Sequence, residues 1–248
     1  MARFDILPQP VAHTGGQQPA LMPCAACDVR ELTICDALRD REIDRMAQIV
    51  TRIPVPAGRT LFQEGDDADH VYNIIDGSLR LFKLMPDGRR QITGFLFATD
   101  FVGIALKKRY AYSAETITDS VICRFPREKL EALFAELPAL ETRLLETAGN
   151  ELIAAQDQML LLGRKTAVER VASFLLHLTK RLRARGMKGD MIGLPMTRTD
   201  MGDYLGLTVE TVSRTFTKLR RDGLIATPTP HEVEICDLDG LREVAEGS

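Results

Sequence analysis

Apolar positions recur every three or four residues through segment 196–223, and this spacing predicts two helices joined by a short turn. The first helix is expected to start at Thr199 or Asp200, and Thr208 is placed to cap the second. Gly206 lies between them, where a tight turn needs left-handed backbone. The expected core residues are Met201, Tyr204 and Leu205 of the first helix and Val212, Phe216 and Leu219 of the second.

The opposite face of the second helix is polar and ends in a basic cluster. Its residues are Glu210, Ser213, Arg214, Thr217, Lys218, Arg220 and Arg221. An acid, a hydroxyl and an arginine within five residues suit base edges in a major groove, and the basic end suits phosphates. By periodicity alone, an amphipathic surface helix is the commoner interpretation. The turn glycine, the cap and the basic flank together favour a DNA-recognition helix.

Short apolar runs separated by glycines fill residues 52–127 and predict antiparallel β structure. The runs include T-L-F, V-Y-N-I-I, L-R-L-F-K-L and I-T-G-F-L-F. Short strands with glycine turns are typical of a barrel or sandwich, and we interpret them as a double-stranded β-helix, or β-roll. P-D-G-R-R at residues 86–90 is expected at a hairpin tip. The interior of the roll could hold a small ligand or be a packed core.

Two helices are expected next, one over residues 127–137 and a longer one over 138–166. The longer helix carries a heptad seam that suits a parallel two-fold dimer, and a second stripe is expected to face the β-roll. Burial of the seam within one chain is the alternative. The seam consists of Leu145, Ala148, Leu152, Ala155, Met159 and Leu162, and the second stripe of Leu144, Ile153, Leu160 and Leu161.

A helix at residues 39–49 capped by Asp36 or Asp40, a helix at 168–182 and a hairpin wing beyond Gly223 complete the expected elements. The predicted fold class is α+β, with a β-roll sensory domain, a long dimerisation helix and a C-terminal winged helix-turn-helix domain. The expected divisions are a flexible tail over residues 1–22, the cysteine segment and β-roll over 23–137, the dimerisation helix over 138–166 and the DNA-binding domain over 167–248.

Charge is divided unevenly along the chain of 248 residues, whose formal net charge is −3. Residues 164–223 hold 13 Lys and Arg against 6 Asp and Glu, a balance of +7, and the remaining 19 against 29 give −10. A basic module on an acidic body is typical of a nucleic-acid contact confined to one end. Apolar runs stay well short of the ~18 residues of a membrane span, and the N-terminus lacks a signal-peptide core. We therefore expect a cytoplasmic protein with no membrane partner.

Cysteines gather near the N-terminus, where C-A-A-C-D-V-R-E-L-T-I-C contains Cys24, Cys27 and Cys35. A metal centre with four ligands needs one more, and Cys123, at the end of an expected strand, is the natural candidate. Cys236 is the competitor, and we interpret it as an ordinary buried thiol. The spacing alone leaves zinc, thiol redox chemistry and iron–sulfur open. A thiol oxidoreductase using Cys24 and Cys27 lacks the βαβ context of that motif, so we do not expect an enzyme.

Three stretches resemble the CRP/FNR superfamily of bacterial transcription regulators, in particular its FNR and FixK-like branch. They are G-R-T-L-F-Q-E-G-D-x-A-D-x-V-Y, D-G-R-R-Q-I-T-G-F-L-F and, most specifically, Y-L-G-L-T-V-E-T-V-S-R. The resemblance covers nearly the whole chain and implies a cyclic-nucleotide-binding-like roll and a homodimer on double-stranded DNA.

The same resemblance implies that Glu210, Ser213 and Arg214 recognise a palindrome of the TTGAT-N4-ATCAA type. Arg214 can bond guanine O6 and N7, Glu210 can accept from cytosine N4, and Ser213 can meet thymine O4. Val209 can pack against a thymine methyl group. The other residues expected at the DNA are Thr197, Arg198, Thr208, Lys218 and Arg221.

FNR-like members hold an oxygen-labile [4Fe-4S] cluster on three N-terminal cysteines and one distant cysteine. This set maps onto Cys24, Cys27, Cys35 and Cys123, and implies a regulator whose dimerisation and DNA binding are lost in oxygen. The best-known members have five residues between the second and third cysteines, whereas seven separate Cys27 from Cys35. A longer loop closes at small entropic cost. Some FixK-like relatives carry no cluster, so a cluster-free regulator controlled by abundance, thiol oxidation or another ligand is the alternative.

The resemblance also bears on RNA polymerase and cyclic AMP as partners. A contact with RNA polymerase is expected through the hairpin around Asp87. Cyclic AMP is not expected, because the Gly-Glu and Arg-Ser pairs that bind its phosphate in the CRP branch are missing. Val102, Gly103 and Ile104 stand in that region.

Overall fold

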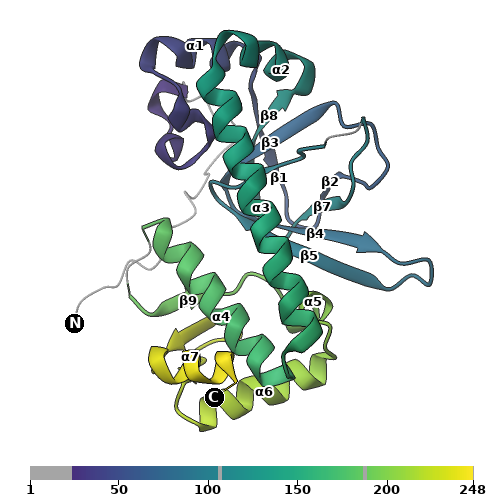
Figure 1. Cartoon of the computed structure of the whole chain (residues 1–248), viewed down its shortest axis with the longest axis vertical. Helices are drawn as coiled ribbons and strands as arrows, with labels where there is room; N and C mark the ends of the chain where they lie inside the picture. The colour runs from purple at the N-terminus through teal and green to yellow at the C-terminus, as the bar shows by residue number, and fades with distance from the viewer. Residues whose placement is uncertain (1–23, 106–107, 187–188, 248) are drawn as a thin grey trace, which may run out of the picture.

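The computed structural model describes residues 24–105, 108–186 and 189–247. The tail predicted for residues 1–22 lies outside the described residues. Figure 1 shows a β-roll, a C-terminal unit of helices around a small sheet, and one long helix, α3, running past both. The predicted α+β fold with its three parts is confirmed.

The N-terminal segment forms three 3-10 turns and one α-helix that cover one end of the roll. They are η1 (Cys24–Ala26), η2 (Arg30–Leu32), η3 (Ile34–Ala37) and α1 (Asp40–Ile49). The N-cap of α1 is Arg39, not Asp36 or Asp40 as predicted. Arg39 takes this position because its backbone N–H donates to the Glu42 carboxylate at 2.9 Å, which stabilises the first turn.

The β-roll consists of two four-stranded antiparallel sheets with the strand orders β1-β8-β3-β6 and β2-β7-β4-β5. Its strands are β1 (Thr51–Val55), β2 (Thr60–Phe62), β3 (His70–Asp76), β4 (Ser78–Leu84), β5 (Arg90–Phe97), β6 (Phe101–Val102), β7 (Ser113–Thr116) and β8 (Ser120–Pro126). Residues 85–89 connect β4 to β5, with Gly88 at φ 84°, so the predicted hairpin tip lies in this turn. Phe62, Tyr72 and Tyr110 stack inside the roll and belong to its packed interior.

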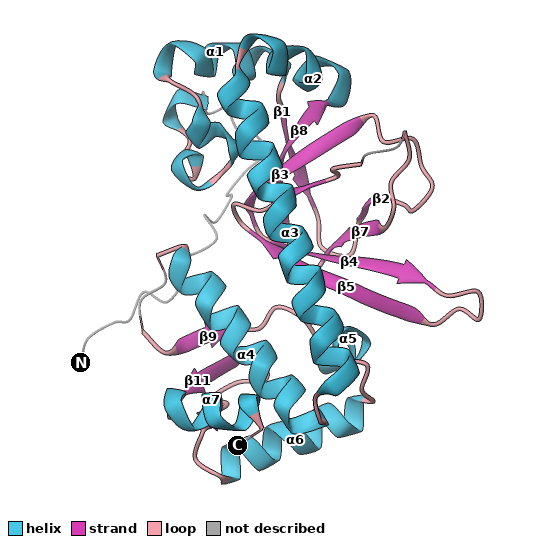
Figure 2. Cartoon of the chain, viewed as in Figure 1, coloured by secondary structure: helices cyan, strands magenta, loops and turns pink. Residues whose placement is uncertain are grey.

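The helices after the roll follow the predicted order. α2 (Arg127–Glu136) is followed by α3 (Pro138–Arg164), whose start is favoured by proline in its first turn. The C-terminal unit contains α4 (Ala167–Ala184), β9 (Met191–Gly193), α5 (Arg198–Leu205), α6 (Val209–Arg221), β10 (Ile225–Ala226), β11 (Glu232–Ile235) and α7 (Leu238–Glu246). The small sheet has the order β10-β11-β9, so the predicted wing gains a third strand (Figure 2).

The core of the C-terminal unit continues onto the outside of the roll. Phe82, Ile92, Phe95 and Phe97 of β4 and β5 belong to the same buried cluster as the apolar residues of α4, α5 and α6. Burial of this shared apolar surface holds the two units together. A separate cluster joins the N-terminal segment, α1 and α2 to the start of α3 at Leu140.

Candidate nucleic-acid interface and cysteine site

The two helices predicted in segment 196–223 are α5 and α6. Helix α5 begins at Arg198, earlier than expected, because Thr197 is its N-cap and accepts from the Asp200 N–H at 3.1 Å. Asp200 returns the bond by accepting from the Thr197 N–H at 3.0 Å, a reciprocal capping box. Gly206 has φ 63°, which the tight turn requires. Thr208 caps α6 and accepts from the Thr211 N–H at 3.2 Å, as predicted.

Gly202 permits the close approach of the two helices. A Cβ atom at this position would lie 2.6 Å from the Leu207 carbonyl oxygen, which is closer than real contacts allow. The sequence prediction did not use this residue, since its signal is a steric one that appears only once the helices are packed. Val212, Phe216 and Leu219 are buried, and so are Met201 and Leu205.

The outer face of α6 is exposed and free to enter a groove. Glu210, Ser213 and Arg214 all lie on this face, and Val209 is 38% exposed. The pKa of Glu210 is lowered by hydrogen bonds to its own backbone N–H and to the Thr208 hydroxyl, which favour the carboxylate. Arg214 Nη2 contacts Thr211 Oγ1 at 3.4 Å, which leaves most of its donors available.

The basic end of α6 is partly neutralised within the chain. Lys218 Nζ pairs with Asp222 Oδ2 at 2.8 Å, and Arg221 Nε pairs with Asp222 Oδ1 at 3.3 Å. Exposed pairs of this kind contribute little to stability, so both cations can exchange Asp222 for a phosphate.

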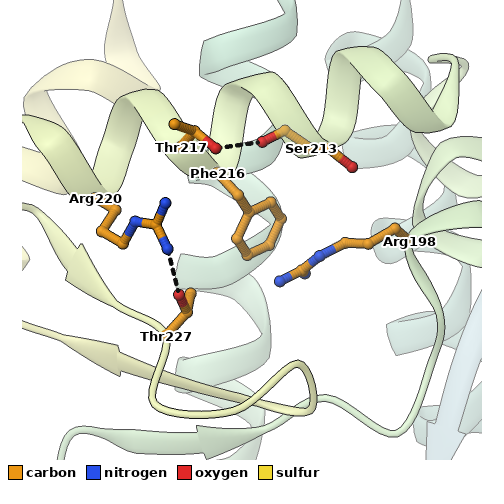
Figure 3. Close-up of a pocket in the computed structure, with 6 residues that line it drawn as sticks. All are labelled: Arg198, Ser213, Phe216, Thr217, Arg220 and Thr227. Carbon is orange, nitrogen blue, oxygen red and sulfur yellow. Dashed lines mark hydrogen bonds between the residues drawn. The ribbon is translucent and has the colours of Figure 1, made fainter.

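A polar notch lies between the start of α5, α6 and the wing (Figure 3). The cavity measures about 160 Å³. The guanidinium carbon of Arg198 sits 3.4 Å from the centroid of the Phe216 ring, and Arg220 Nη1 donates to Thr227 Oγ1 at 3.5 Å. The notch is lined by Arg198, Ser213, Phe216, Thr217, Arg220 and Thr227. Two guanidinium groups and three hydroxyls suit a phosphate group.

Sequence reasoning did not assign the notch as one site. Thr227 comes from β-wing sequence and meets α6 only through folding, so no spacing could have identified it. Arg220 was expected in the exposed basic end of the helix but was not among the residues assigned individually to DNA.

The four predicted cysteine ligands surround a single cavity at the end of the β-roll. Cys24, Cys27 and Cys35 come from the N-terminal segment, and Cys123 comes from β8. Segments almost a hundred residues apart in sequence therefore bring these thiols together. Asn73 of β3, which lies opposite Cys123 in the strand register, also lines the cavity.

Side-chain hydrogen bonds stabilise the cysteine segment over residues 30–40. Arg30 donates to the Leu38 carbonyl at 2.6 Å and to Asp40 Oδ1 at 2.8 Å. The Thr33 hydroxyl accepts from the Cys35 N–H at 3.2 Å and so caps η3. These hydrogen bonds fix the shape of residues 30–40, and Ile34 and Leu38 attach the segment to the roll through the buried cluster that contains Val71 and Phe125.

Burial raises the pKa of three of the cavity thiols, those of Cys24, Cys35 and Cys123, and so favours their protonated form. It raises the pKa of Cys35 to about 11 and that of Cys123 to about 12, and nearby thiols add to the second effect. Desolvation also raises the pKa of Cys24. A positive metal centre reverses this balance by favouring the thiolate form.

The ligand atoms and the volume of the cavity show whether it suits a [4Fe-4S] cluster. Four cysteine thiols are the ligand set of a [4Fe-4S] cluster. The side-chain oxygen of Asn73 is buried and has no hydrogen-bond partner in the described part of the chain, which marks a polar position at the cavity. The cavity measures only about 20 Å³, room for about one water molecule. The residues fit a cluster by chemistry, and the cysteine segment must shift outward to admit one.

Within the described ranges, no three His, Cys, Asp or Glu side chains, those of the four cavity cysteines included, lie close enough together to hold a metal ion as they stand. Cys236 is exposed, so its interpretation as a buried thiol was wrong. It directly follows Ile235, the last residue of β11, and the buried alternation of that short strand does not extend to it.

The predicted dimer seam lies on an exposed face of α3. Leu145, Leu152 and Met159 are 67%, 61% and 70% exposed in the single chain. Ala155 is also exposed, whereas Ala148 and Leu162 are half-buried.

The prediction that the second stripe faces the roll was wrong for Ile153 and Leu160, which are 58% and 64% exposed. Leu144 packs on the N-terminal cluster and Leu161 on the C-terminal unit. The stripe divides because Leu144 and Leu161 each meet an apolar cluster, whereas Ile153 and Leu160 belong to no apolar cluster of the described residues.

Taken together, a winged helix-turn-helix joined by a long helix to a β-roll defines a DNA-binding transcription regulator. Residues 169–244 match the Crp-like helix-turn-helix domain, and residues 52–136 match the cyclic nucleotide-binding domain.

Similar proteins agree with this class. The chain is 44% identical over 203 residues to the nitrogen fixation regulation protein FixK of Bradyrhizobium diazoefficiens, covering 82% of this chain and 86% of that protein. It is 40% identical to the transcriptional activator protein FnrL of Cereibacter sphaeroides, covering 90% and 91%. The structure of FixK2 from Bradyrhizobium japonicum superposes with a TM-score of 0.75 at 35% identity, covering 79% of this chain and 97% of that one. The chain belongs to the CRP/FNR superfamily of transcription regulators, in its FixK-like branch, and is not an enzyme.

Regulators of the CRP family bind DNA and act as dimers. Across the described residues, no helix is long and apolar enough to cross a membrane.

Proposed function

We propose that this regulator responds to oxygen through a [4Fe-4S] cluster held by Cys24, Cys27, Cys35 and Cys123. The observation that carries the proposal is the convergence of these four thiols on one cavity from two distant segments. When bound, such a cluster would supply an oxygen-labile link between the N-terminal segment and the roll. In this proposal residues 23–137 sense the signal, 138–166 dimerise and 167–248 bind DNA.

The N-terminal segment is suited to influence the dimer helix. Ile34 and Leu38, which flank Cys35, are buried in the same cluster as Leu140 at the start of α3. Ligation of Cys24, Cys27 and Cys35 would hold this segment on α3, and its release would loosen the first turns of the helix. A modest change in dimer free energy then becomes a large change in DNA occupancy, because binding needs both recognition helices.

The dimer we propose pairs the α3 seam with its own copy. The exposed Leu145, Leu152 and Met159 are the anchors, Ala148 and Ala155 allow close approach of the two helices, and Leu162 completes the seam. This places the two α6 helices for successive major grooves of a TTGAT-N4-ATCAA-type palindrome.

At each half-site, α6 is proposed to read bases and the surrounding residues to bind phosphates. Arg214 bonds guanine, Glu210 bonds cytosine, Ser213 bonds thymine and Val209 packs on a thymine methyl. Residues proposed at the DNA backbone are Thr197, Arg198, Thr208, Lys218 and Arg221, with Arg220 and Thr227 added by the notch.

The β4–β5 hairpin is the proposed contact with RNA polymerase. Next to Asp87 it exposes Leu84 and Met85, which are 62% and 46% exposed and offer an apolar surface beside a charge. Cyclic AMP is not proposed as a ligand.

The test is anaerobic purification followed by iron and acid-labile sulfide assays. We expect four irons and four sulfides per chain, and loss of both in a variant with Cys123→Ser. The matched control Cys236→Ser should keep full loading. A colourless wild-type protein without sulfide contradicts the proposal.

A cluster-free regulator is the second candidate, and the small cavity favours it. The four free thiols already line a space of only about 20 Å³, so a chain without a cluster needs no movement of the segment. This candidate predicts tight DNA binding in air by protein with reduced thiols.

A further inference from the structure

The C-terminal unit is attached to the β-roll by charged contacts as well as by the shared apolar core. One set of contacts lies at the turn of residues 97–100, between β5 and β6. Arg181 Nη2 of α4 donates to Asp100 Oδ2 at 2.6 Å, and Arg185 Nη2 donates to Asp100 Oδ1. Arg181 Nη1 also donates to the Phe95 carbonyl at 2.8 Å. Because the Asp100 side chain is only 19% exposed, these ion pairs are poorly screened by solvent.

The backbone of the same turn is held in an unfavourable conformation. Thr99 has φ 80°, and it is the one non-glycine residue with positive φ among those the structure describes. A β-branched residue rarely adopts this conformation, so surrounding contacts must enforce it. Its hydroxyl accepts from Arg185 Nε at 2.8 Å, and its N–H donates to the Ile74 carbonyl at 2.8 Å.

These backbone bonds tie the turn to the strand beneath the cysteine cavity. The Ile74 N–H donates to the Asp100 carbonyl at 2.9 Å, which closes a two-bond clamp between β3 and the turn. The residues on either side of Ile74 in β3, Asn73 and Ile75, both line the cysteine cavity. A continuous chain of short contacts therefore runs from the cavity through Ile74 and the turn to α4.

We propose that the 97–100 turn is a relay that transmits a change at the cysteine cavity to the orientation of the DNA-binding unit. A shift of β3 or β8 at the cavity moves Ile74, the strained turn follows through its two backbone bonds, and Asp100 moves α4 through the two arginines. The inference rests on the proposed function for what the signal is, a change at the cysteine cavity caused by oxygen. The path from the cavity to α4 does not depend on it. It adds a route within one chain to the route through the dimer helix.

The structure also contains a contact against which the relay can be judged. Arg90 of β5 bonds Asp203 of α5 at 2.9 Å and attaches the same two units, and its side-chain hydrogen bonds in the described part of the chain go to Asp200 and Asp203 of α5 rather than to β3 or the 97–100 turn. A variant of Arg90 should loosen the docking without interrupting the path from the cavity. Loss of docking and loss of transmission can therefore be separated.

The test uses reduced, metal-free full-length protein and amide hydrogen exchange, so it does not depend on a cluster. Cys123→Leu enlarges a side chain that lines the cavity, and Ala114→Val overpacks β7 in the other sheet as a matched control. We expect Cys123→Leu to speed exchange about threefold or more in β3, in the turn and at the C-terminal end of α4. Ala114→Val should leave α4 unchanged.

The second arm breaks the relay. Asp100→Asn keeps the size of the side chain and its acceptor for the Phe97 N–H, but removes the charge that holds the arginines. In this background Cys123→Leu should still alter β3 and no longer alter α4, whereas in an Arg90→Ala background it should alter both. If Cys123→Leu fails to fold, the smaller change Asn73→Ala replaces it at the same cavity.

Transmission that survives Asp100→Asn unchanged overturns the relay, and so does an α4 that ignores the cavity variant in the wild-type background. Neither result bears on iron or sulfide content, which tests the proposed function separately.

Discussion

Replacing Leu152 by alanine tests the proposed dimer seam. Leu152 is 61% exposed in the single chain, so a partner helix could remove about three fifths of its surface from water. Full burial of a leucine side chain contributes about 1.5–3 kcal/mol, and this coverage therefore about 1–2 kcal/mol per copy. Two-fold symmetry counts the residue twice, which gives about 2–4 kcal/mol per dimer. Leu152→Ala should raise the dimer dissociation constant about 30-fold to several hundred-fold.

Sedimentation equilibrium measures this constant directly. Asn150→Ala, at an exposed position of the same helix but off the seam, controls for changes in helix propensity. Binding to a palindromic duplex should weaken with Leu152→Ala, whereas binding of single chains to an isolated half-site should not. Equal dimer constants for the two variants would refute the assignment of the seam.

Three further outcomes are expected. Arg214→Ala should remove about 1–3 kcal/mol of half-site preference, whereas Arg221→Ala should weaken matched and scrambled duplexes alike and lower the salt slope by about 1; equal losses for both variants in competition binding argue against these roles. Arg220→Ala should also act without regard to sequence and abolish ethylation interference at one phosphate per half-site, and an unchanged pattern excludes the notch. Burial raises the pKa of Cys35 to about 11 and of Cys123 to about 12, so above the unfolded thiol pKa of about 8.5 the unfolded state loses protons that the folded state keeps. The free energy of unfolding of metal-free protein should therefore fall between about pH 9 and 11, and in urea titrations it should fall less when both thiols are replaced by serine; equal slopes contradict this.

Local patterns predicted most of the fold because each element carries its own signal. The glycine turns of the roll, the cap at Thr208 and the buried stripe of α6 depend on neighbours within a few residues, which periodicity can detect. The predicted start of α5 was later than the observed one because Thr197, Thr199 and Asp200 are all residue types that can cap a helix. Only the reciprocal hydrogen bonds of the capping box select Thr197.

What could not be predicted depends on contacts between distant segments. Ile153 and Leu160 have the spacing of buried residues, but burial also requires a surface opposite them, and the described residues of a single chain supply none. The attachment of Asp100 to Arg181 crosses 81 positions of sequence, so no window could reveal it. The cysteines are different, because their shared metal-binding chemistry predicts a common site although Cys123 is distant in sequence from the other three.

The most direct test of the oxygen-sensing account is the affinity of one anaerobic preparation for its palindrome before and after exposure to air. The account predicts tight binding with iron and sulfide present, and a loss of affinity that follows the loss of sulfide. Unchanged affinity in air, or tight binding by protein that never contained sulfide, would contradict it.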